Sequence, residues 1–235
     1  MSPPSGDVVA TYPASWPSSP TFRRRFYAVV RGLIAGFAAI YWRLEVDGAE
    51  RLPATGAFIL APVHRSNIDT PIMSTLTHRY MRYLGKEEMW KYRWSAWLWD
   101  TLGAFPVKRD SVDREAMRQC RLALEAGEPL VVYPEGTRRT SPVVEDLYDG
   151  AAHLALRTGA PIIPVGIGGS IRAMPRGAKF FRPVKVCVVV GEPIVPEVLE
   201  RGHSAPRRAV KELTERLAAE LQVVFDDARV RAGDR

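Results

Sequence analysis

Four short apolar runs do most to constrain how this chain can fold. They span residues 57–63, 130–133, 162–167 and 184–190, are rich in β-branched side chains and are bounded by glycine, proline or polar residues. Apolar runs of this length are typical of strands buried on both faces of a sheet. A further short strand is expected at 44–46. The sequence therefore predicts a sheet whose middle strands are shielded from water.

Helical patterns lie between these runs. Within residues 111–126, Met117, Cys120 and Leu124 recur at helical spacing, and Gly127 follows the end of the pattern. Further helices are predicted over 151–158 and from 206 to about 229, the last with one apolar stripe. Because strands alternate with helices, the sequence predicts an α/β fold with a mixed, largely parallel sheet flanked by helices.

The N-terminal region divides into two parts. Residues 1–21 are rich in proline and serine and are expected to form a disordered or surface arm. Residues 22–43 contain three arginines at 23–25 and then an apolar stretch from 26 to 42, whose uninterrupted part, 32–42, has 11 residues. A spanning helix needs roughly 20 residues. We therefore expect an interfacial membrane helix; the alternative is a core helix packed on the rest of the chain, residues 44–235.

The charge balance of the chain indicates which classes of molecule it can bind. The 33 Lys and Arg residues outnumber the 26 Asp and Glu residues, which gives a net charge of +7. This charge favours a partner rich in negative charge, such as a nucleic acid, an anionic membrane or a phosphorylated substrate. Cys120 and Cys187 lie in apolar stretches without metal-like spacing, so we expect buried thiols, no disulfide and a reducing compartment.

The segment from Ala61 to Pro71 places a histidine just after a buried strand and an aspartate five positions later. On one continuous helix, His64 and Asp69 would point about 140° apart, so the chain must turn between them for the side chains to meet. In a turn, Asp69 can fix the tautomer of His64 and leave the other ring nitrogen to take a proton. Ser66 is a candidate nucleophile, with a structural role in the turn as the alternative.

The segment His64 to Asp69 resembles the HxxxxD motif of the glycerolipid acyltransferases, the family of bacterial 1-acyl-glycerol-3-phosphate acyltransferases. Three more segments follow in the family's order. They are GAFPVKRD at 103–110, YPEGTRR at 133–139 and APIIPVGI at 160–167. The resemblance implies an acyltransferase domain over 44–235, with His64 and Asp69 as its catalytic base and carboxylate.

The resemblance also implies a binding site for a lysophospholipid acceptor. Lys108, Arg109 and above all Arg138 would bind the acceptor's phosphate. Gly136 would let backbone amides approach it, and Thr137 would add a hydroxyl donor. Glu135 would orient Arg138 or accept a hydrogen bond from the glycerol part. The alternative for the cations is a solvated or ion-paired loop.

The donor implied is a thioester, either acyl-CoA or acyl carrier protein, and the location implied is the cytoplasmic face of the cell membrane, peripheral or monotopic. No metal, cofactor or nucleic acid is expected, because no metal-ligand spacing or nucleotide motif is present. Arg139 and Asp149 depart from the family pattern, so the identity of the acceptor stays open. A thioesterase and a non-catalytic membrane-binding protein remain alternative functions, and the oligomeric state cannot be read from the sequence.

A tryptophan stripe is the last feature of note. Trp90, Trp94 and Trp97 would lie on one face of a single helix, next to Lys91 and Arg93. Such a stripe fits either core packing or contact with lipid.

Overall fold

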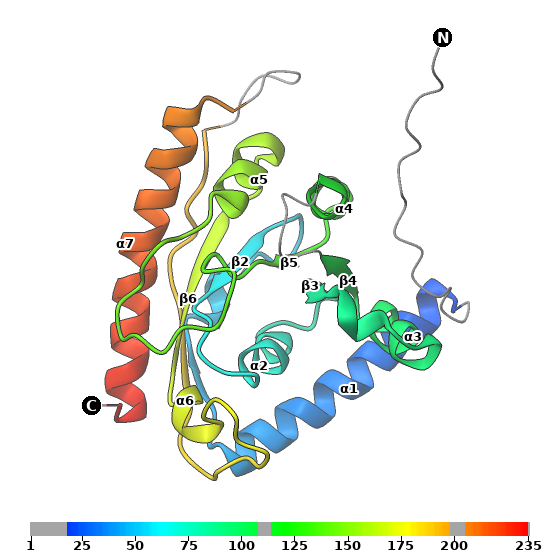
Figure 1. Ribbon diagram of the computed structural model, residues 1–235, viewed down its shortest axis with the longest axis vertical. Coiled ribbons are helices and arrows are strands. Elements are labelled where there is room, and N and C mark those ends of the chain that lie inside the picture. The colour runs from blue at the N-terminus through cyan, green and yellow to red at the C-terminus, as the bar shows by residue number, and fades with distance from the viewer. Residues whose placement is uncertain (1–17, 108–113, 198–204, 235) are drawn as a thin grey trace.

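A central sheet organises the computed structural model, which describes residues 18–107, 114–197 and 205–234 (Figure 1). The strands follow the order β1-β7-β6-β2-β5-β3-β4, and the neighbouring pairs are parallel except β6 with β7, which are antiparallel. The strands are β1 (Glu45–Asp47), β2 (Ile59–Pro62), β3 (Arg82–Lys86), β4 (Ala104–Val107), β5 (Leu130–Val131), β6 (Ile162–Gly168) and β7 (Cys187–Val190). The predicted α/β class with a mixed, largely parallel sheet is confirmed.

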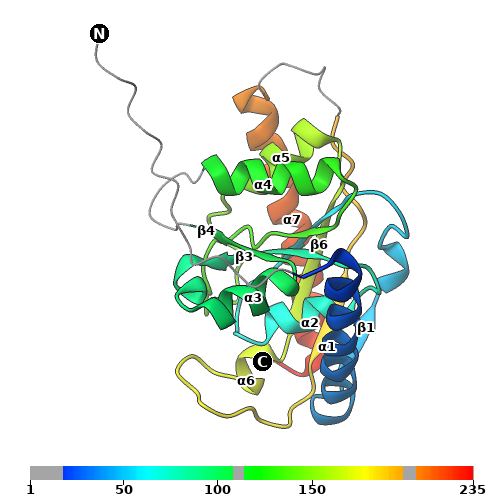
Figure 2. The same cartoon turned by 90° about the vertical axis from the view of Figure 1, so that its right-hand side faces the viewer.

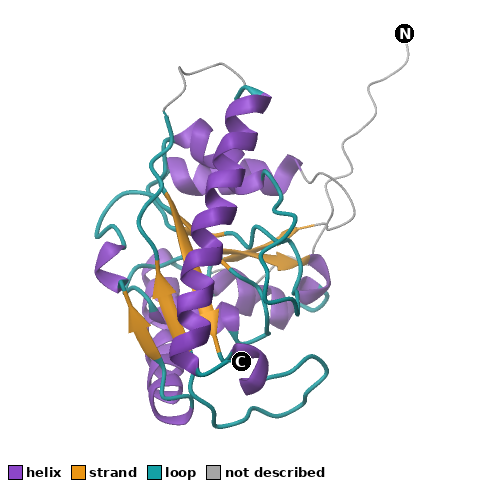
Figure 3. Ribbon diagram, turned by 90° about the vertical axis from the view of Figure 1, so that its left-hand side faces the viewer, coloured by secondary structure: helices purple, strands orange, loops and turns teal. Residues whose placement is uncertain are grey.

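Helices cover both faces of this sheet. Figure 1 shows α7 running along one face, with α4 and α5 near its N-terminal half, while α1 and α2 lie on the other; Figure 3 views the molecule from the α7 side. The helices are α1 (Pro20–Tyr41), α2 (Asp69–Thr75), α3 (Arg93–Thr101), α4 (Arg114–Glu125), α5 (Gly150–Thr158), α6 (Ser170–Ala173) and α7 (Arg207–Ala232), with 3₁₀ turns at Ala49–Arg51 and Glu87–Trp90.

The alternation of side chains along β2 distributes the core between the two layers. Leu60 packs in a cluster with Tyr27 of α1 and Ile72 of α2, whereas Ile59 packs in a second cluster with Leu124 of α4 and Leu217 of α7. Successive residues of a strand point to opposite faces, so a strand covered on both sides must be apolar throughout. This is the physical reason for the continuous apolar run at 57–63.

Helix α7 lies unusually close to the sheet because β6 carries glycines where the two elements cross. A Cβ atom added to Gly166 would lie 2.0 Å from the carbonyl oxygen of Val224, and one added to Gly168 would lie 2.1 Å from that of Ala228. The absence of a side chain at these positions lets the helix backbone contact the strand directly.

Helix α1 begins with a defined cap and presents two different faces. Ser19 accepts a hydrogen bond from the backbone N–H of Phe22, and Pro20 occupies the first turn. Tyr27 and Ala38 are buried against the domain, whereas Leu33 is 70% exposed. The helix therefore combines a core-facing side with an exposed apolar side. Among the described helices, none is long and apolar enough to cross a membrane.

The tryptophans do not share one helix face. Trp90 belongs to the 3₁₀ turn, is 2% exposed and donates a hydrogen bond from Nε1 to Asp100 at 2.8 Å. Trp94 and Trp97 belong to α3; Trp94 is 59% exposed, and Trp97 packs against Phe26 of α1. The prediction of a single stripe is wrong because the chain changes direction between Trp90 and Arg93.

Candidate active site

The candidate site lies where β2 and β5 end. These two strands are parallel neighbours, so the segments that follow them leave the sheet at the same edge. The segment after β2 carries His64, and the segment after β5 carries Tyr133 to Arg139. A hydrogen bond of 2.9 Å from the backbone N–H of Arg139 to the carbonyl of His64 joins the two segments directly. The sheet thereby brings together two motifs that lie about 70 positions apart.

A tight turn brings His64 and Asp69 into contact. Asp69 is the first residue of α2 and is 0% exposed. Its Oδ2 atom accepts hydrogen bonds from the backbone N–H groups of Arg65 and Ser66, each at 2.6 Å, and lies 3.1 Å from Nδ1 of His64. An ionised carboxylate accepts hydrogen bonds only, so Nδ1 carries the proton and Nε2 is left to accept one.

The ring of Tyr133 packs against the imidazole of His64. The two rings stack with centroids 4.0 Å apart, and the phenol hydroxyl of Tyr133 lies 2.9 Å from Oγ1 of Thr70. Burial raises the pKa of Tyr133 well above its ordinary value of 10.0, and the negative charge of Asp69 raises it further. Tyr133 is therefore a neutral ring that holds His64 in place. The His64 side chain is 12% exposed, which leaves one edge of the ring open.

Glu135 is fully buried, and its partners differ from those expected. Both of its carboxylate oxygens accept hydrogen bonds from Nη1 of Arg65, at 2.8 and 2.6 Å, and Oε2 also accepts one from the backbone N–H of His64 at 2.9 Å. The expectation was that Glu135 would orient Arg138 or contact the acceptor. The structure instead places it behind the turn from His64 to Asp69, where it accepts a hydrogen bond from the backbone N–H of His64.

The residues of the third motif from Gly136 to Arg138 lie at or near the surface. Gly136 has a φ of 64°, and a Cβ atom there would lie 2.5 Å from the ring of Tyr148, so this turn requires glycine. Thr137 is exposed, and Arg138 is partly exposed. Within the described ranges, the Arg138 guanidinium has no hydrogen-bond or ion-pair partner. The predicted cations Lys108 and Arg109 lie outside the described residues.

Ser66 has a structural position. It is 2% exposed, and its hydroxyl donates a hydrogen bond to the carbonyl of Met174 at 2.8 Å. This bond ties the turn that carries His64 to the segment after α6. The hydroxyl is thus engaged with the backbone, in agreement with the structural alternative for this residue.

Sequence reasoning missed Arg65 and Tyr133 as parts of the site. Each stands directly beside a residue that was singled out, Arg65 after His64 and Tyr133 before the Pro134 to Arg138 segment. The signal for Arg65 was a charged residue next to a buried strand, which needs a buried partner. Tyr133 was counted as the end of an apolar strand, and nothing in its spacing indicated a contact with His64.

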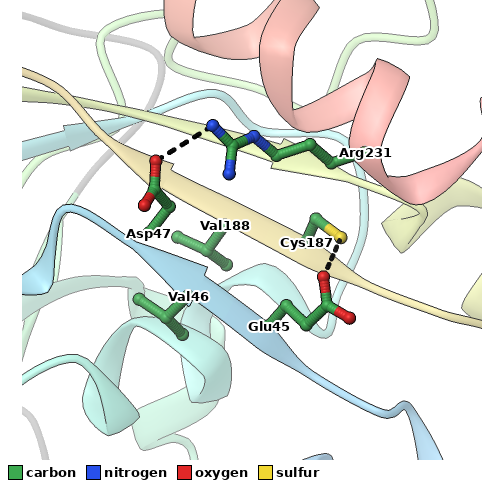
Figure 4. A pocket seen from close by; sticks show the side chains of 6 residues that line it. All are labelled: Glu45, Val46, Asp47, Cys187, Val188 and Arg231. Atoms are coloured by element: carbon green, nitrogen blue, oxygen red, sulfur yellow. Dashed lines mark hydrogen bonds and ion pairs between the residues drawn. The ribbon is translucent and has the colours of Figure 1, made fainter.

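Two hollows of about 250 Å³ lie elsewhere in the described part of the chain. Figure 4 shows the first, between β1, β7 and the end of α7. Its polar groups have partners: Arg231 lies 3.1 Å from Asp47, the Cys187 thiol lies 3.9 Å from Glu45, and Glu45 also pairs with Lys185 at 2.8 Å. The second borders Arg65 and is lined by residues of α6 and α7. Neither is lined by His64, and no group of metal-ligating side chains gathers among the described residues.

A family model of acyltransferases matches residues 43–168, more than half of the chain, and the chain therefore belongs to the Acyltransferase family. The matched region contains all four motif segments, so the resemblance drawn from them is confirmed at the level of the family. Among solved structures, the chain is similar to the 1-acyl-sn-glycerophosphate acyltransferase PlsC of Thermotoga maritima. The TM-score is 0.68 at 25% identity, covering 86% of this chain and 80% of that one.

Two further relatives are similar in sequence. The chloroplastic 1-acyl-sn-glycerol-3-phosphate acyltransferase BAT2 of Brassica napus is 24% identical over 180 residues, which are 74% of this chain and 52% of that protein. A 1-acyl-sn-glycerol-3-phosphate acyltransferase of Streptococcus pneumoniae is 25% identical over 153 residues, 62% of this chain and 55% of that protein. The chain spans about half the length of these relatives.

Proposed function

We propose that this chain transfers a fatty acyl group from a thioester to the free hydroxyl of 1-acylglycerol-3-phosphate or a related lysophospholipid, as a step in phospholipid biosynthesis. The observation that carries the proposal is the 3.1 Å contact between Nδ1 of His64 and the buried carboxylate of Asp69. A neutral imidazole oriented in this way is a general base with one nitrogen free. The names of the similar proteins support the choice of acceptor.

In the proposed reaction, Nε2 of His64 takes the proton of the acceptor hydroxyl as that oxygen attacks the thioester carbonyl. The new C–O bond forms, the C–S bond breaks, and the thiolate leaves and is protonated. Asp69 stabilises the imidazolium that forms in between. A positioned base of this kind contributes about 10² to 10⁴ in rate. A thioester already has a good leaving group, so direct transfer without a covalent acyl-enzyme suits the residues present.

The acceptor phosphate is proposed to bind Arg138, together with Lys108 and Arg109. The guanidinium of Arg138 is partly exposed and unpaired within the described residues, so it can form a bidentate contact with phosphate. Thr137 is exposed beside it and can add a hydroxyl donor, whereas the backbone N–H of Gly136 already donates to the carbonyl of Tyr133 at 3.0 Å, so Gly136 contributes close approach rather than a donor. Glu135, by contrast, is proposed as a positioning residue, because both of its oxygens are engaged with Arg65 and the His64 backbone.

The site is proposed to work at a membrane surface. The exposed side of α1 carries Val29, Leu33 and Ile40, which are 63%, 70% and 84% exposed, and the helix contains no acidic residue. An amphipathic, basic segment of this kind lies in the interface with its apolar face toward acyl chains. We propose the cytoplasmic face of the cell membrane as its location, and either acyl-CoA or acyl carrier protein as the donor.

The deciding experiment follows both products of the reaction. Purified chain is incubated with acyl-CoA and lysophosphatidic acid, and free thiol and diacyl product are measured for wild type and His64→Ala. We expect equimolar thiol and diacyl product for wild type and a loss of both by at least about 10²-fold for His64→Ala. Equal rates for the two proteins would falsify the proposed mechanism.

The same measurement separates the other functions. Thiol release that does not depend on the lysolipid would identify a thioesterase instead. If no thiol is released with several donors, including acyl carrier protein, and several lysolipids, the chain is a membrane-binding protein without this activity.

A further inference from the structure

A loop far from α1 in sequence continues its exposed apolar side. The loop runs from Met174 to Pro183, between α6 and β7, and a hydrogen bond of 2.8 Å from the backbone N–H of Arg182 to the carbonyl of Ala173 closes it. In Figures 1 and 2 it lies beside the C-terminal end of α1. It is therefore a compact closed loop rather than an extended connection.

Aromatic contacts join this loop to α1. The ring of Phe181 lies 6.0 Å from that of Phe37 and 5.4 Å from that of Trp42, and the hydroxyl of Tyr41 donates to the carbonyl of Phe181 at 2.9 Å. Phe37 is itself 42% exposed on the apolar side of α1. Phe180 precedes Phe181 in the chain, and its side chain is 83% exposed. An exposed phenylalanine thus extends the apolar surface beyond the helix.

The charges on the loop and on α1 have one sign. The loop holds Arg176, Lys179 and Arg182, all exposed, and no acidic residue occurs from Met174 to Pro183 or within α1. The three cations form no ion pair with any residue in the described ranges. Apolar side chains surrounded by unpaired cations match an anionic bilayer, whose phosphates attract the cations while its acyl region takes up the aromatic rings.

We infer that the loop from Met174 to Pro183 is a second membrane contact, which inserts Phe180 into an anionic phospholipid bilayer beside α1. The inference rests on the interfacial location proposed for α1 and adds a second point of attachment to it. The loop begins at Met174, whose carbonyl accepts the hydrogen bond of Ser66, two positions from His64. Two contacts fix the orientation of the domain on the bilayer more firmly than one, and this hydrogen bond links the second contact to the turn that carries His64.

Binding of the full chain to vesicles tests the loop directly. The vesicles contain phosphatidylcholine with about one third phosphatidylglycerol, and cosedimentation measures the bound fraction. Each Lys or Arg near such a surface contributes about fivefold to binding, so replacing Arg176, Lys179 and Arg182 by Gln is expected to weaken it on the order of 100-fold. Phe180→Asp is expected to weaken it at least about tenfold.

Matched controls lie on α7. Arg207, Arg208 and Lys211 are exposed, so their triple Gln variant has the same net charge as the loop variant. Val223 is 65% exposed, so Val223→Asp matches Phe180→Asp. Both controls should bind vesicles as wild type does. The inference is overturned if the loop variants bind as tightly as their controls, or if Phe180→Asp abolishes self-association of the chain and leaves vesicle binding unchanged.

A fluorescent label on the loop reports insertion into the bilayer directly. Phe180→Cys carries an environment-sensitive fluorophore, and the native thiols of Cys120 and Cys187 are buried and unreactive by comparison. Its emission should shift to shorter wavelength when anionic vesicles are added, whereas a label on Val223→Cys should not respond. Neither assay requires catalysis. A chain that binds through this loop but transfers no acyl group would contradict the proposed function and leave the inference intact.

Discussion

At the scale of single residues, the site depends on one carboxylate oxygen. Oδ2 of Asp69 accepts two backbone N–H groups and faces Nδ1 of His64, while Oδ1 is buried and has no partner in the described part of the chain. The backbone hydrogen bonds shape the turn, and the contact with Nδ1 orients the imidazole of His64, the proposed base. The same carboxylate oxygen therefore determines both the shape of the turn and the orientation of the imidazole.

Replacing this carboxylate by an amide should separate the two roles. In Asp69→Asn the amide oxygen can still accept the N–H groups of Arg65 and Ser66, so the turn should form, but His64 loses its anionic partner. We expect kcat to fall by about 10² or more. Thiol release measures kcat, and circular dichroism checks that the variant is folded. An unchanged kcat would show that Asp69 only shapes the turn.

The buried ion pair of Arg65 and Glu135 leads to a second prediction. Glu135→Gln leaves a buried guanidinium without its counter-charge, which should cost about 3–5 kcal/mol of unfolding free energy. Replacing both residues by apolar ones, Arg65→Met with Glu135→Leu, should recover much of this loss. Urea titrations measure the free energy of unfolding of both variants. As a control, Glu115→Gln breaks an exposed pair with Arg118 and should leave the midpoint nearly unchanged.

Arg138 should affect binding of the acceptor rather than stability. Because its guanidinium is partly exposed and has no partner in the described ranges, Arg138→Gln should leave the urea midpoint unchanged. It should raise KM for lysophosphatidic acid by about tenfold, the loss expected for a charge-assisted contact of about 1.5 kcal/mol. The exposed Arg216 on α7 provides the control substitution. If both variants have the same KM, Arg138 does not bind the phosphate.

At the scale of elements, α1 must satisfy two environments at once. Tyr27 reaches inward, and its hydroxyl lies 3.1 Å from that of Tyr83 on β3, whereas Ile40 is 84% exposed. The sequence alone left a choice between a core helix and an interfacial helix. The structure shows that packing on the domain occupies one side of the helix and leaves the apolar opposite side uncovered.

Substitutions on the two sides of α1 should therefore differ in what they change. Ala38 is fully buried, so Ala38→Leu overfills its site and should reduce the unfolding free energy by about 1–3 kcal/mol. Ile40→Ser should change stability by no more than about 0.5 kcal/mol. It should instead weaken binding to anionic vesicles several-fold. The proposed role of α1 fails if Ile40→Ser binds vesicles as wild type does.

The elements that sequence reasoning found and missed differ in burial. The strands at 57–63, 130–133, 162–167 and 184–190 were predictable because both faces are covered. β3 was missed because Arg82 and Lys86 interrupt its apolar run, and β4 was missed because its run, Ala104–Val107, has only four residues and includes a proline. Likewise, the spacing of His64 and Asp69 required a turn, but only the fold shows that Glu135 and Tyr133 surround it.

At the scale of the whole molecule, buried tyrosines link stability to pH. Burial raises the pKa of Tyr27, and it raises those of Tyr83 and Tyr133 well above the ordinary 10.0. Above pH 10 the unfolded chain releases these protons while the folded chain retains them. Through these tyrosines, stability should begin to fall near pH 9 and decline further as pH rises.

Urea titrations between pH 8 and 11 measure this decline. Tyr83→Phe removes one of the groups responsible, so its stability should fall less steeply with pH, whatever its stability at pH 8. Tyr148→Phe, at an exposed position, is the matched control and should keep the wild-type slope. A Tyr83→Phe slope equal to that of wild type would contradict this account.

The pairing of β1 with β7 has a consequence for how the protein is made. Val46 lies opposite Val188, so the β1 edge of the sheet is completed only when nearly the whole domain has left the ribosome. The exposed apolar side chains of α1, such as Leu33, emerge much earlier. We therefore expect the membrane contact proposed for α1 to be available on the nascent chain before the sheet is complete.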